Sequence, residues 1–403
     1  MILPRTGLGL SIGLLSMAIA ALIPDQARAQ AASAPAPGVY RLYIGTYTGG
    51  NGPDRSRGIY LLDLDTRTGE LTEPRLAAES TDPSFLAIHP NGEFLYAANE
   101  SGAILGRHEG GVSAFAIDST TGKLTPLNQQ LSAGSGPCHL IVDHEGKNVL
   151  VANYGSGSFA CLPIGRDGKL QPSESHVQHQ GHGTIPARQA GPHAHSVNLD
   201  PANRFAFVAD LGLDGVYGYA FNPSEGLLPR PPMVTPVKPG SGPRHFAFHP
   251  SGRFAYVINE MANTINAFAY DADSGVLSTM QVVSTLPDDF HGQSWTADIH
   301  VHPSGRFLYG SNRGHDSIAI FAIDPTTGRL TPIGHESTRG KMPRNFTIDP
   351  TGAWLLAENQ DSDSIVAFRI DPAKGTLTAS GRTVKVARPV CIQMIPKPPG
   401  AGR

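Results

Sequence analysis

The sequence of 403 residues contains few cysteines and few charged side chains. The three cysteines, Cys138, Cys161 and Cys391, are too few for a disulfide framework, although one bridge stays possible. No CxxC pair or cluster of His and Cys suggests a zinc site. Charged residues make up 16% of the chain and the net charge is −3, so nothing indicates a surface that binds nucleic acid.

A long apolar run occurs only near the N-terminus. Arg5 precedes the apolar segment 7–23, and Ala27 and Ala29 then form a small-residue cleavage site. This order is typical of a secretory signal peptide, residues 1–29, cleaved after Ala29. An uncleaved membrane anchor is the alternative. We expect an exported, periplasmic protein without stable membrane association after cleavage, whose residues 30–38 form a flexible linker.

Glycine and proline are abundant, with 46 and 34 residues. Together with 40% hydrophobic residues, enough for a core, they predict many short strands joined by turns. No nucleophile elbow, Walker loop or dinucleotide fingerprint occurs in a suitable context. The composition therefore favours an all-β fold.

A short motif, D-x-x-x-G-x-L or a close variant, recurs along the chain. Asp or Asn followed by Gly between β-rich segments is typical of hairpins, because these residues tolerate positive φ. Successive copies lie about fifty residues apart, the length of a propeller blade. They begin at Asp65, Asp118, Arg166 (a shortened copy), Asn222, Asp271, Asp324 and Asp371.

A second repeat has the form strand, tight turn, strand. Each copy is followed by a third strand and then by the glycine turn into a fourth, as in a propeller blade. Six repeats are complete; N-terminal segments lack a first strand, and residues 388–396 have its form. We predict an all-β, seven-bladed β-propeller over residues 39–397, closed by strands from both termini, with a C-terminal tail at 398–403.

Two positions of every repeat should meet at one mouth of the central channel. The first strand of each blade lines the channel, and its start lies beside the end of its antiparallel neighbour. At the start of the first strands, the ring is Ser84, Cys138, His195, Arg244, Ala297, Arg344 and Val390. Just past the second strands, the ring is Tyr47, Glu100, Tyr154, Leu211, Glu260, Arg313 and Gln360.

Four polar residues of these rings come from three successive blades: His195, Arg244, Glu260 and Arg313. Arginine binds carboxylate or phosphate through a planar fork, and histidine exchanges protons near neutral pH. Glutamate is a general base if its pKa is raised. These four are the predicted catalytic residues; channel salt bridges without catalysis are the alternative that spacing leaves open.

Six further residues are candidates for substrate binding because of their place in or beside the rings. They are His193, His245, His300, Arg344, Glu100 and Tyr154. By contrast, His89, His249 and His302 lie in or next to "HP" turns, and we expect them to be structural.

The motifs "PHAHS", "GSGPRHFAFHP", "INE" and "SNRGHDSIA" resemble those of the lactonase family of seven-bladed propellers. That family includes propeller-type 6-phosphogluconolactonases and fungal carboxy-cis,cis-muconate cyclases. The resemblance runs from about Tyr40 to Pro396. It implies lactone ring opening by water, or its reverse, at the residues matching His195, Arg244, Glu260 and Arg313. It also implies no metal or other cofactor, unlike the calcium-dependent gluconolactonase propellers.

The expected partner is a small-molecule lactone, anionic or polyhydroxylated. A phosphorylated sugar lactone belongs to the cytosol, so an exported protein would instead meet unphosphorylated or aromatic-derived lactones. A muconate-type cycloisomerase and a non-catalytic periplasmic binding propeller are the alternatives. The sequence leaves the oligomeric state open, and it does not decide whether His195 or Glu260 is the base.

Overall fold

The structure is a computed structural model that describes residues 1–2, 35–49, 55–101, 110–173, 175–398 and 400. It divides into residues 1–32 and a compact unit of residues 33–403. The predicted signal peptide and its cleavage after Ala29 lie outside the described residues, apart from residues 1–2, as do parts of the predicted linker and tail. No helix in the described ranges has the length and hydrophobicity needed to span a membrane.

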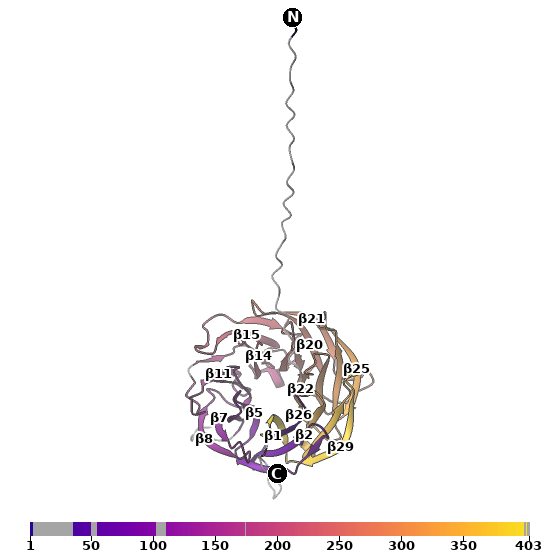
Figure 1. The fold of residues 1–403 in the computed structure, drawn as a ribbon. Coiled ribbons are helices and arrows are strands. Elements are labelled where there is room, and N and C mark those ends of the chain that lie inside the picture. The colour runs from indigo at the N-terminus through magenta and orange to yellow at the C-terminus, as the bar shows by residue number, and fades with distance from the viewer. Residues whose placement is uncertain (3–34, 50–54, 102–109, 174, 399, 401–403) are drawn as a thin grey trace. The chain divides into compact units, whose positions relative to one another are not determined.

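Seven antiparallel sheets of four or five strands are arranged around a central axis (Figure 1). The innermost strands are β5 (Pro83–Ile88), β9 (Pro137–Val142), β13 (Ala194–Leu199), β18 (Pro243–Phe248), β22 (Trp295–Val301), β26 (Pro343–Ile348) and β30 (Pro389–Pro396). The second strands are β6 (Phe94–Asn99), β10 (Asn148–Asn153), β14 (Phe205–Asp210), β19 (Phe254–Asn259), β23 (Phe307–Arg313), β27 (Trp354–Asn359) and β1 (Val39–Thr46).

The outer half of each sheet completes the blade. The third strands are β7 (Gly111–Ile117), β11 (Ser158–Pro163), β15 (Gly215–Asn222), β20 (Thr264–Asp271), β24 (Ser317–Ile323), β28 (Ser364–Ile370) and β2 (Gly58–Asp65). The outermost are β8 (Leu124–Leu131), β12 (Ser175–Gln178), β16 (Gly226–Leu227) with β17 (Met233–Pro236), β21 (Val276–Ser284), β25 (Leu330–Ser337), β29 (Leu377–Lys385) and β3 (Glu70–Leu71) with β4 (Arg75–Glu79). Within the described ranges there are also two short helices, α1 (Pro186–Gln189) and a 3₁₀ turn η1 (Gln360–Ser362).

The ring closes through strands from both ends of the chain. C-terminal β30 pairs antiparallel with N-terminal β1, in a register that places Ile44 opposite Ile392. Figure 1 shows the purple β1 and β2 beside yellow C-terminal strands. Each innermost strand also contacts the innermost strands of both neighbouring blades, including β30 with β5. The predicted seven-bladed propeller, closed by both termini, is confirmed.

Neighbouring blades are joined by hydrogen bonds that repeat around the ring. The hydroxyl of Tyr96 donates to the carbonyl of Gly168, the turn glycine of the next blade, at 3.0 Å. Gly168 has a φ of 78°, and a Cβ there would lie 2.3 Å from the ring of Phe94. The motif therefore needs glycine both for its left-handed backbone and for close packing against the preceding blade. Matching tyrosine–glycine pairs are Tyr43–Gly122, Tyr256–Gly328 and Tyr309–Gly375.

The histidines of the "HP" turns also join blades. A ring nitrogen of His89, His249 and His302 lies 2.8–2.9 Å from the carbonyl oxygen of Gly146, Gly305 and Gly352, respectively. Each of these glycines lies in the turn of the next blade. The structural role predicted for the three histidines is confirmed.

The innermost strand of every blade carries a β-bulge at the same level. In β18, for example, Pro243 pairs with Asn259 and His245 with Ile258, so the intervening Arg244 is an extra residue. Equivalent shifts occur in β5, β9, β13, β22, β26 and at the β1–β30 pair. Because a bulge disturbs the alternation of side chains, Arg244 and His245 both face residues of the channel.

Glu358 on β27 is completely buried. The corresponding register positions of β6, β10 and β14 hold alanines, Ala98, Ala152 and Ala209. Burial, together with the nearby charge of Asp298, raises the pKa of Glu358 well above its ordinary value. The folded protein thus binds a proton at Glu358 more tightly than the unfolded chain does.

We expect Glu358→Gln to flatten the pH dependence of the melting temperature. In the wild type, the contribution of Glu358 to the free energy of unfolding is greatest below the ordinary carboxyl pKa of 4.5 and falls as the pH rises above it. The amide does not ionise, so the variant should gain stability relative to wild type as the pH rises. Glu73→Gln makes the same change at an exposed position and should leave the pH dependence unaltered. Identical pH profiles for wild type and Glu358→Gln would contradict this account.

Candidate active site

The two predicted rings of side chains meet at one mouth of the channel. There they line a cavity of about 320 Å³. Its walls are formed by Glu100, Cys138, Tyr154, Arg188, His195, Glu260, Trp295, Arg313 and Arg344. Arg244 is only 2% exposed and lies against the cavity wall through its contact with Glu260.

Glu260 is the centre of an ion-pair cluster, which we call the Arg–Glu cluster: Glu260 with Arg188, Arg244 and Arg313. Oε2 of Glu260 accepts hydrogen bonds from Nε of Arg244 at 3.1 Å and from Nη2 of Arg313 at 2.8 Å. Oε1 accepts from Nη2 of Arg188 at 2.5 Å. Strand pairing explains this convergence, because Arg244 and Glu260 flank the same open end of the β18–β19 hairpin.

The cluster determines the charge state of Glu260. Burial alone would raise the pKa of its carboxyl, but the guanidinium groups of Arg313 and Arg244 outweigh burial and hold the pKa at about 2. Burial, and then repulsion by Arg244, lower the pKa of Arg313 to about 9. Glu260 is therefore an anion at neutral pH and is too weak a base to take a proton from water.

His195 is the buried imidazole of the cavity. Its Nδ1 lies 3.6 Å from Sγ of Cys138, and its ring meets that of Tyr154 edge-on at 5.3 Å. Burial, and then the charge of Arg244, lower the pKa of His195 well below its ordinary value of 6.5. The imidazole is accordingly neutral at pH 7 and has a lone pair able to accept a proton.

The side of the cavity next to His195 is aromatic. Tyr154 stacks on His193 with ring centroids 4.5 Å apart, and Nδ1 of His193 lies 2.8 Å from the carbonyl oxygen of Tyr154. The backbone N–H of His193 donates to Asp210 at 2.8 Å. His193 thus braces Tyr154, which lines the cavity, and is not itself part of the wall.

Glu100 and Arg344 also line the cavity. The hydroxyl of Tyr47 donates to Oε2 of Glu100 at 2.7 Å, and the guanidinium of Arg344 lies 5.3 Å from the centre of the Tyr47 ring. Burial alone would lower the pKa of Arg344, but the nearby Tyr47, Glu100 and Glu260 raise it. Arg344 is therefore a permanent cation in the wall.

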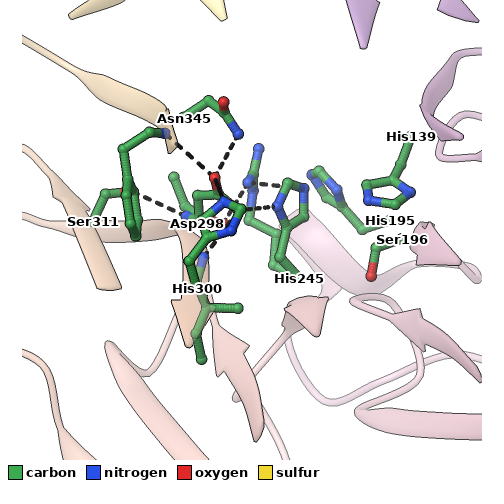
Figure 2. Close-up of polar contacts among 12 residues, drawn as sticks. His139, His195, Ser196, His245, Asp298, His300, Ser311 and Asn345 are labelled. Carbon is green, nitrogen blue, oxygen red and sulfur yellow. Dashed lines mark hydrogen bonds and ion pairs between the residues drawn. The ribbon is translucent and has the colours of Figure 1, made fainter. Parts of the chain in front are cut away.

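His245 and His300 lie outside the mouth cavity. Both line a second cavity, of about 360 Å³, to which all seven innermost strands contribute. Figure 2 shows both rings directed at Asp298. Nδ1 of His245 lies 2.7 Å from Oδ1 of Asp298, and Nε2 of His300 lies 2.9 Å from Oδ2. The structure thus brings eight of the ten predicted residues to or beside the mouth, and places these two deeper in the channel.

Among the residues of these two cavities that the sequence prediction did not include are Arg188, Trp295 and Asp298. Arg188 lies on α1, in an insertion between blades that has no counterpart in the other repeats; its trace in the sequence is the longest interval between turn glycines, from Gly168 to Gly226. Trp295 is the first residue of β22 and lies before Ala297, the residue at which the alignment of repeats places the start of this strand. Asp298 lies within the bulge of β22, between Thr296 and Ile299, and lines the second cavity.

Within the described part of the chain, no group of three or more His, Cys, Asp or Glu residues is arranged to bind a metal ion. Cys138 and Cys391 are buried thiols. The Cys138 thiol donates to the carbonyl oxygen of His195 at 3.3 Å, and Sγ of Cys391 accepts from the backbone N–H of Leu86 at 3.3 Å. These contacts place Cys138 against the base of the cavity.

Comparisons with known proteins agree with this architecture. The family described as "Lactonase, 7-bladed beta-propeller" matches residues 41–394. A 6-phosphogluconolactonase of Bacillus subtilis is 41% identical over 307 residues, which are 76% of this chain and 84% of that protein. One from Formosa agariphila is 36% identical over 313 residues, 76% of this chain and 86% of that protein. The solved structure of a periplasmic gluconolactonase of Pseudomonas aeruginosa has a TM-score of 0.82 and 32% identity, covering 90% of this chain and all (100%) of that one.

Replacing Glu260 should destabilise the protein far more than replacing its most exposed partner. Glu260→Gln leaves buried guanidinium groups without their anion, at a cost of about 3–5 kcal/mol in the free energy of unfolding. The Arg188 side chain is 37% exposed, so Arg188→Gln should cost less than about 1 kcal/mol. Denaturant unfolding of the purified variants measures both values. Equal losses for the two variants would show that Glu260 does not hold the cluster together.

Proposed function

The chain belongs to the lactonase family of seven-bladed β-propellers, enzymes that hydrolyse lactones, and we propose that it acts on an anionic sugar-type lactone bound in the mouth cavity. The observation that carries this proposal is the presence of a neutral buried imidazole, His195, in the same cavity as the Arg–Glu cluster. The 6-phosphogluconolactonase names of the relatives support the substrate class.

We propose that His195, and not Glu260, is the general base. A water oxygen attacks the lactone carbonyl carbon while its proton passes to the ring nitrogen of His195 that does not face Cys138. The tetrahedral intermediate then collapses: the ring C–O bond breaks, and the leaving alkoxide takes the proton from His195. The product is an open hydroxy acid, whose carboxyl group ionises at neutral pH and releases one proton. Because its pKa is lowered, His195 carries no proton at neutral pH and has a free lone pair for the proton of water.

The arginines supply the positive charge that the reaction needs. Negative charge develops on the carbonyl oxygen in the transition state, and fixed cations in a water-poor site stabilise it. Arg313 and Arg344 reach the cavity directly, and the buried Arg244 acts from behind Glu260. Glu260 orients the guanidinium groups of the cluster.

The charge balance of the mouth favours an anionic substrate. Four guanidinium groups, of Arg188, Arg244, Arg313 and Arg344, face two carboxylates, Glu100 and Glu260. A carboxylate or phosphate on the lactone would offset the excess positive charge, and arginine binds either group through paired hydrogen bonds.

The proposed step needs no metal ion, since side chains supply both the base and the positive charge. Export to the periplasm is a separate proposal. It is supported by the N-terminal signal-like segment and by the structural similarity to a protein described as a periplasmic gluconolactonase. Because an exported protein would meet unphosphorylated lactones, 6-phosphogluconolactone is a probe of the anionic preference and not the expected substrate.

His195→Asn should reduce proton release from the lactone by about a hundredfold or more, since that variant lacks the base. In the wild type, kcat/KM should stay constant as the pH falls through 6.5 and decrease only at lower pH, because the pKa of His195 is lowered. Titration of the released acid, above the spontaneous rate, measures both. Treatment with EDTA should leave the rate unchanged, and His144→Asn, at an exposed position, is the matched control.

No turnover of any lactone by the wild type would reject hydrolysis and leave the binding propeller; turnover of an unsaturated dicarboxylate alone would favour the cycloisomerase. A full rate for His195→Asn would exclude His195 as the base.

Gluconolactone and 6-phosphogluconolactone, compared side by side, test the anionic preference. We expect a higher kcat/KM for the phosphorylated lactone, because a charge-assisted hydrogen bond to arginine contributes about 1.5–3 kcal/mol. Arg188→Gln should then raise KM for the phosphorylated lactone by about tenfold and change KM for gluconolactone much less. Equal changes for both substrates would mean that Arg188 does not contact the phosphate.

A further inference from the structure

Arg244 is held by contacts on both sides of its guanidinium group. Towards the mouth, Nε donates to Glu260 at 3.1 Å. Away from the mouth, Nη1 donates to the carbonyl oxygen of Ala297 at 2.5 Å and lies 3.3 Å from Nε2 of His245. Arg244 is buried, so its position depends on these neighbours and not on solvent.

The contact with Arg244 requires one particular tautomer of His245. A guanidinium group can only donate, so Nε2 of His245 must carry a lone pair. Its hydrogen then resides on Nδ1, which faces Oδ1 of Asp298 at 2.7 Å. Burial, and then the charge of Arg244, lower the pKa of His245 to about 4, in keeping with a neutral ring at pH 7.

Asp298 is held by several hydrogen bonds besides its contact with His245. Oδ2 accepts hydrogen bonds from His300, from the side-chain amide of Asn345 and from the backbone N–H of Phe346. Oδ1 accepts from the backbone N–H of Ile299 at 2.9 Å as well as facing His245. Figure 2 shows Asn345, His300 and His245 around Asp298, whose backbone N–H donates to the hydroxyl of Ser311 at 3.0 Å. Burial alone would raise the pKa of Asp298, but His300 and the hydrogen bond from His245 lower it, so the carboxylate is an anion.

We propose that Asp298 and His245 are positioning residues for the lactonase reaction: Asp298 holds His245 in the Nδ1–H tautomer, and the free Nε2 of His245 fixes Arg244 beneath the catalytic cavity. A series of polar contacts thus runs from Asp298 through His245 and Arg244 to Glu260. It links the second cavity, in the channel, to the mouth cavity. The proposal rests on the proposed function in that Arg244 is taken to stabilise charge in the transition state.

Asp298→Asn tests the tautomer with nearly no change of shape. Three donors face Oδ2, so the oxygen of the introduced amide should take that side and its NH₂ group should face His245. The ring must then accept at Nδ1 and carry its hydrogen on Nε2, where it opposes the donor of Arg244. We expect kcat to fall by at least about tenfold with KM changed less than about threefold, because the loss affects the transition state and not ground-state binding.

The tautomer itself is read from the ¹⁵N signals of the histidine rings in the purified protein. The signals of His245 are assigned by their loss in His245→Gln. In the wild type Nε2 should show the signal of an unprotonated nitrogen, and in Asp298→Asn that of a protonated one. An unchanged tautomer in Asp298→Asn, or a switched tautomer with wild-type kcat, would overturn the proposal.

A second pair of variants separates positioning from simple loss of fold. In His245→Gln the side-chain carbonyl can reach the place of Nε2 and accept from Arg244, whereas in His245→Asn the shorter side chain can reach only Asp298. We expect the Gln variant to retain kcat within about threefold and the Asn variant to lose about tenfold. The reverse order would overturn the proposal. His144→Asn, at an exposed position, should change neither kcat nor the His245 signals.

These measurements distinguish a failure of the proposed function from a failure of the positioning role. If the wild type hydrolyses no lactone, the proposed function fails, while the nitrogen signals alone still support or overturn the control of His245 by Asp298. If the wild type is active and the variants keep wild-type kcat, the proposed function stands and the positioning role fails.

Discussion

Pairing of β1 with β30 is the constraint on which the rest of this fold depends. Seven sheets can surround one axis only if the last sheet meets the first, and here a strand from each end of the chain completes that sheet. Closure leaves each innermost strand between two neighbours, which keeps its side chains at one level around the channel. His195, Arg244 and Arg313 belong to three successive blades and converge for this reason.

The balance between the buried arginines and Glu260 determines the charge states of the groups in the mouth cavity. Burying guanidinium groups is costly, and Glu260 offsets that cost by accepting from three of them. The same contacts deprive Glu260 of basicity, and burial together with the charge of Arg244 keeps His195 neutral. The arrangement of the arginines thus keeps Glu260 an anion that accepts their hydrogen bonds and, together with burial, leaves His195 as a neutral imidazole in the same cavity.

Features that the sequence repeats could be predicted, whereas features that occur once could not. The seven glycine turns and the strand–turn–strand motif led to the blades, and alignment of the copies led to the rings containing Arg244 and Glu260. Arg188 was missed because its short helix belongs to one insertion, which an alignment of repeats passes over. Strand alternation also cannot predict a bulge, so the pairing of Arg244 with the adjacent His245 needed the structure. The tautomer of His245 depends on Asp298 of the next blade as well as on the adjacent Arg244, and the local sequence contains only the second.

The position of β30 in the sequence also determines when the ring can close during synthesis. The strand consists of Pro389–Pro396, so it is synthesised after every other strand of the propeller. Until then β1 lacks its inner partner, and the neighbouring β5 and β26 lack the strand that they contact in the finished ring. Earlier blades can form their own hairpins during synthesis, but the ring cannot close until β30 has been made. The nascent chain therefore stays an open arc, and a premature stop before Pro389 would leave a strand edge exposed to other chains.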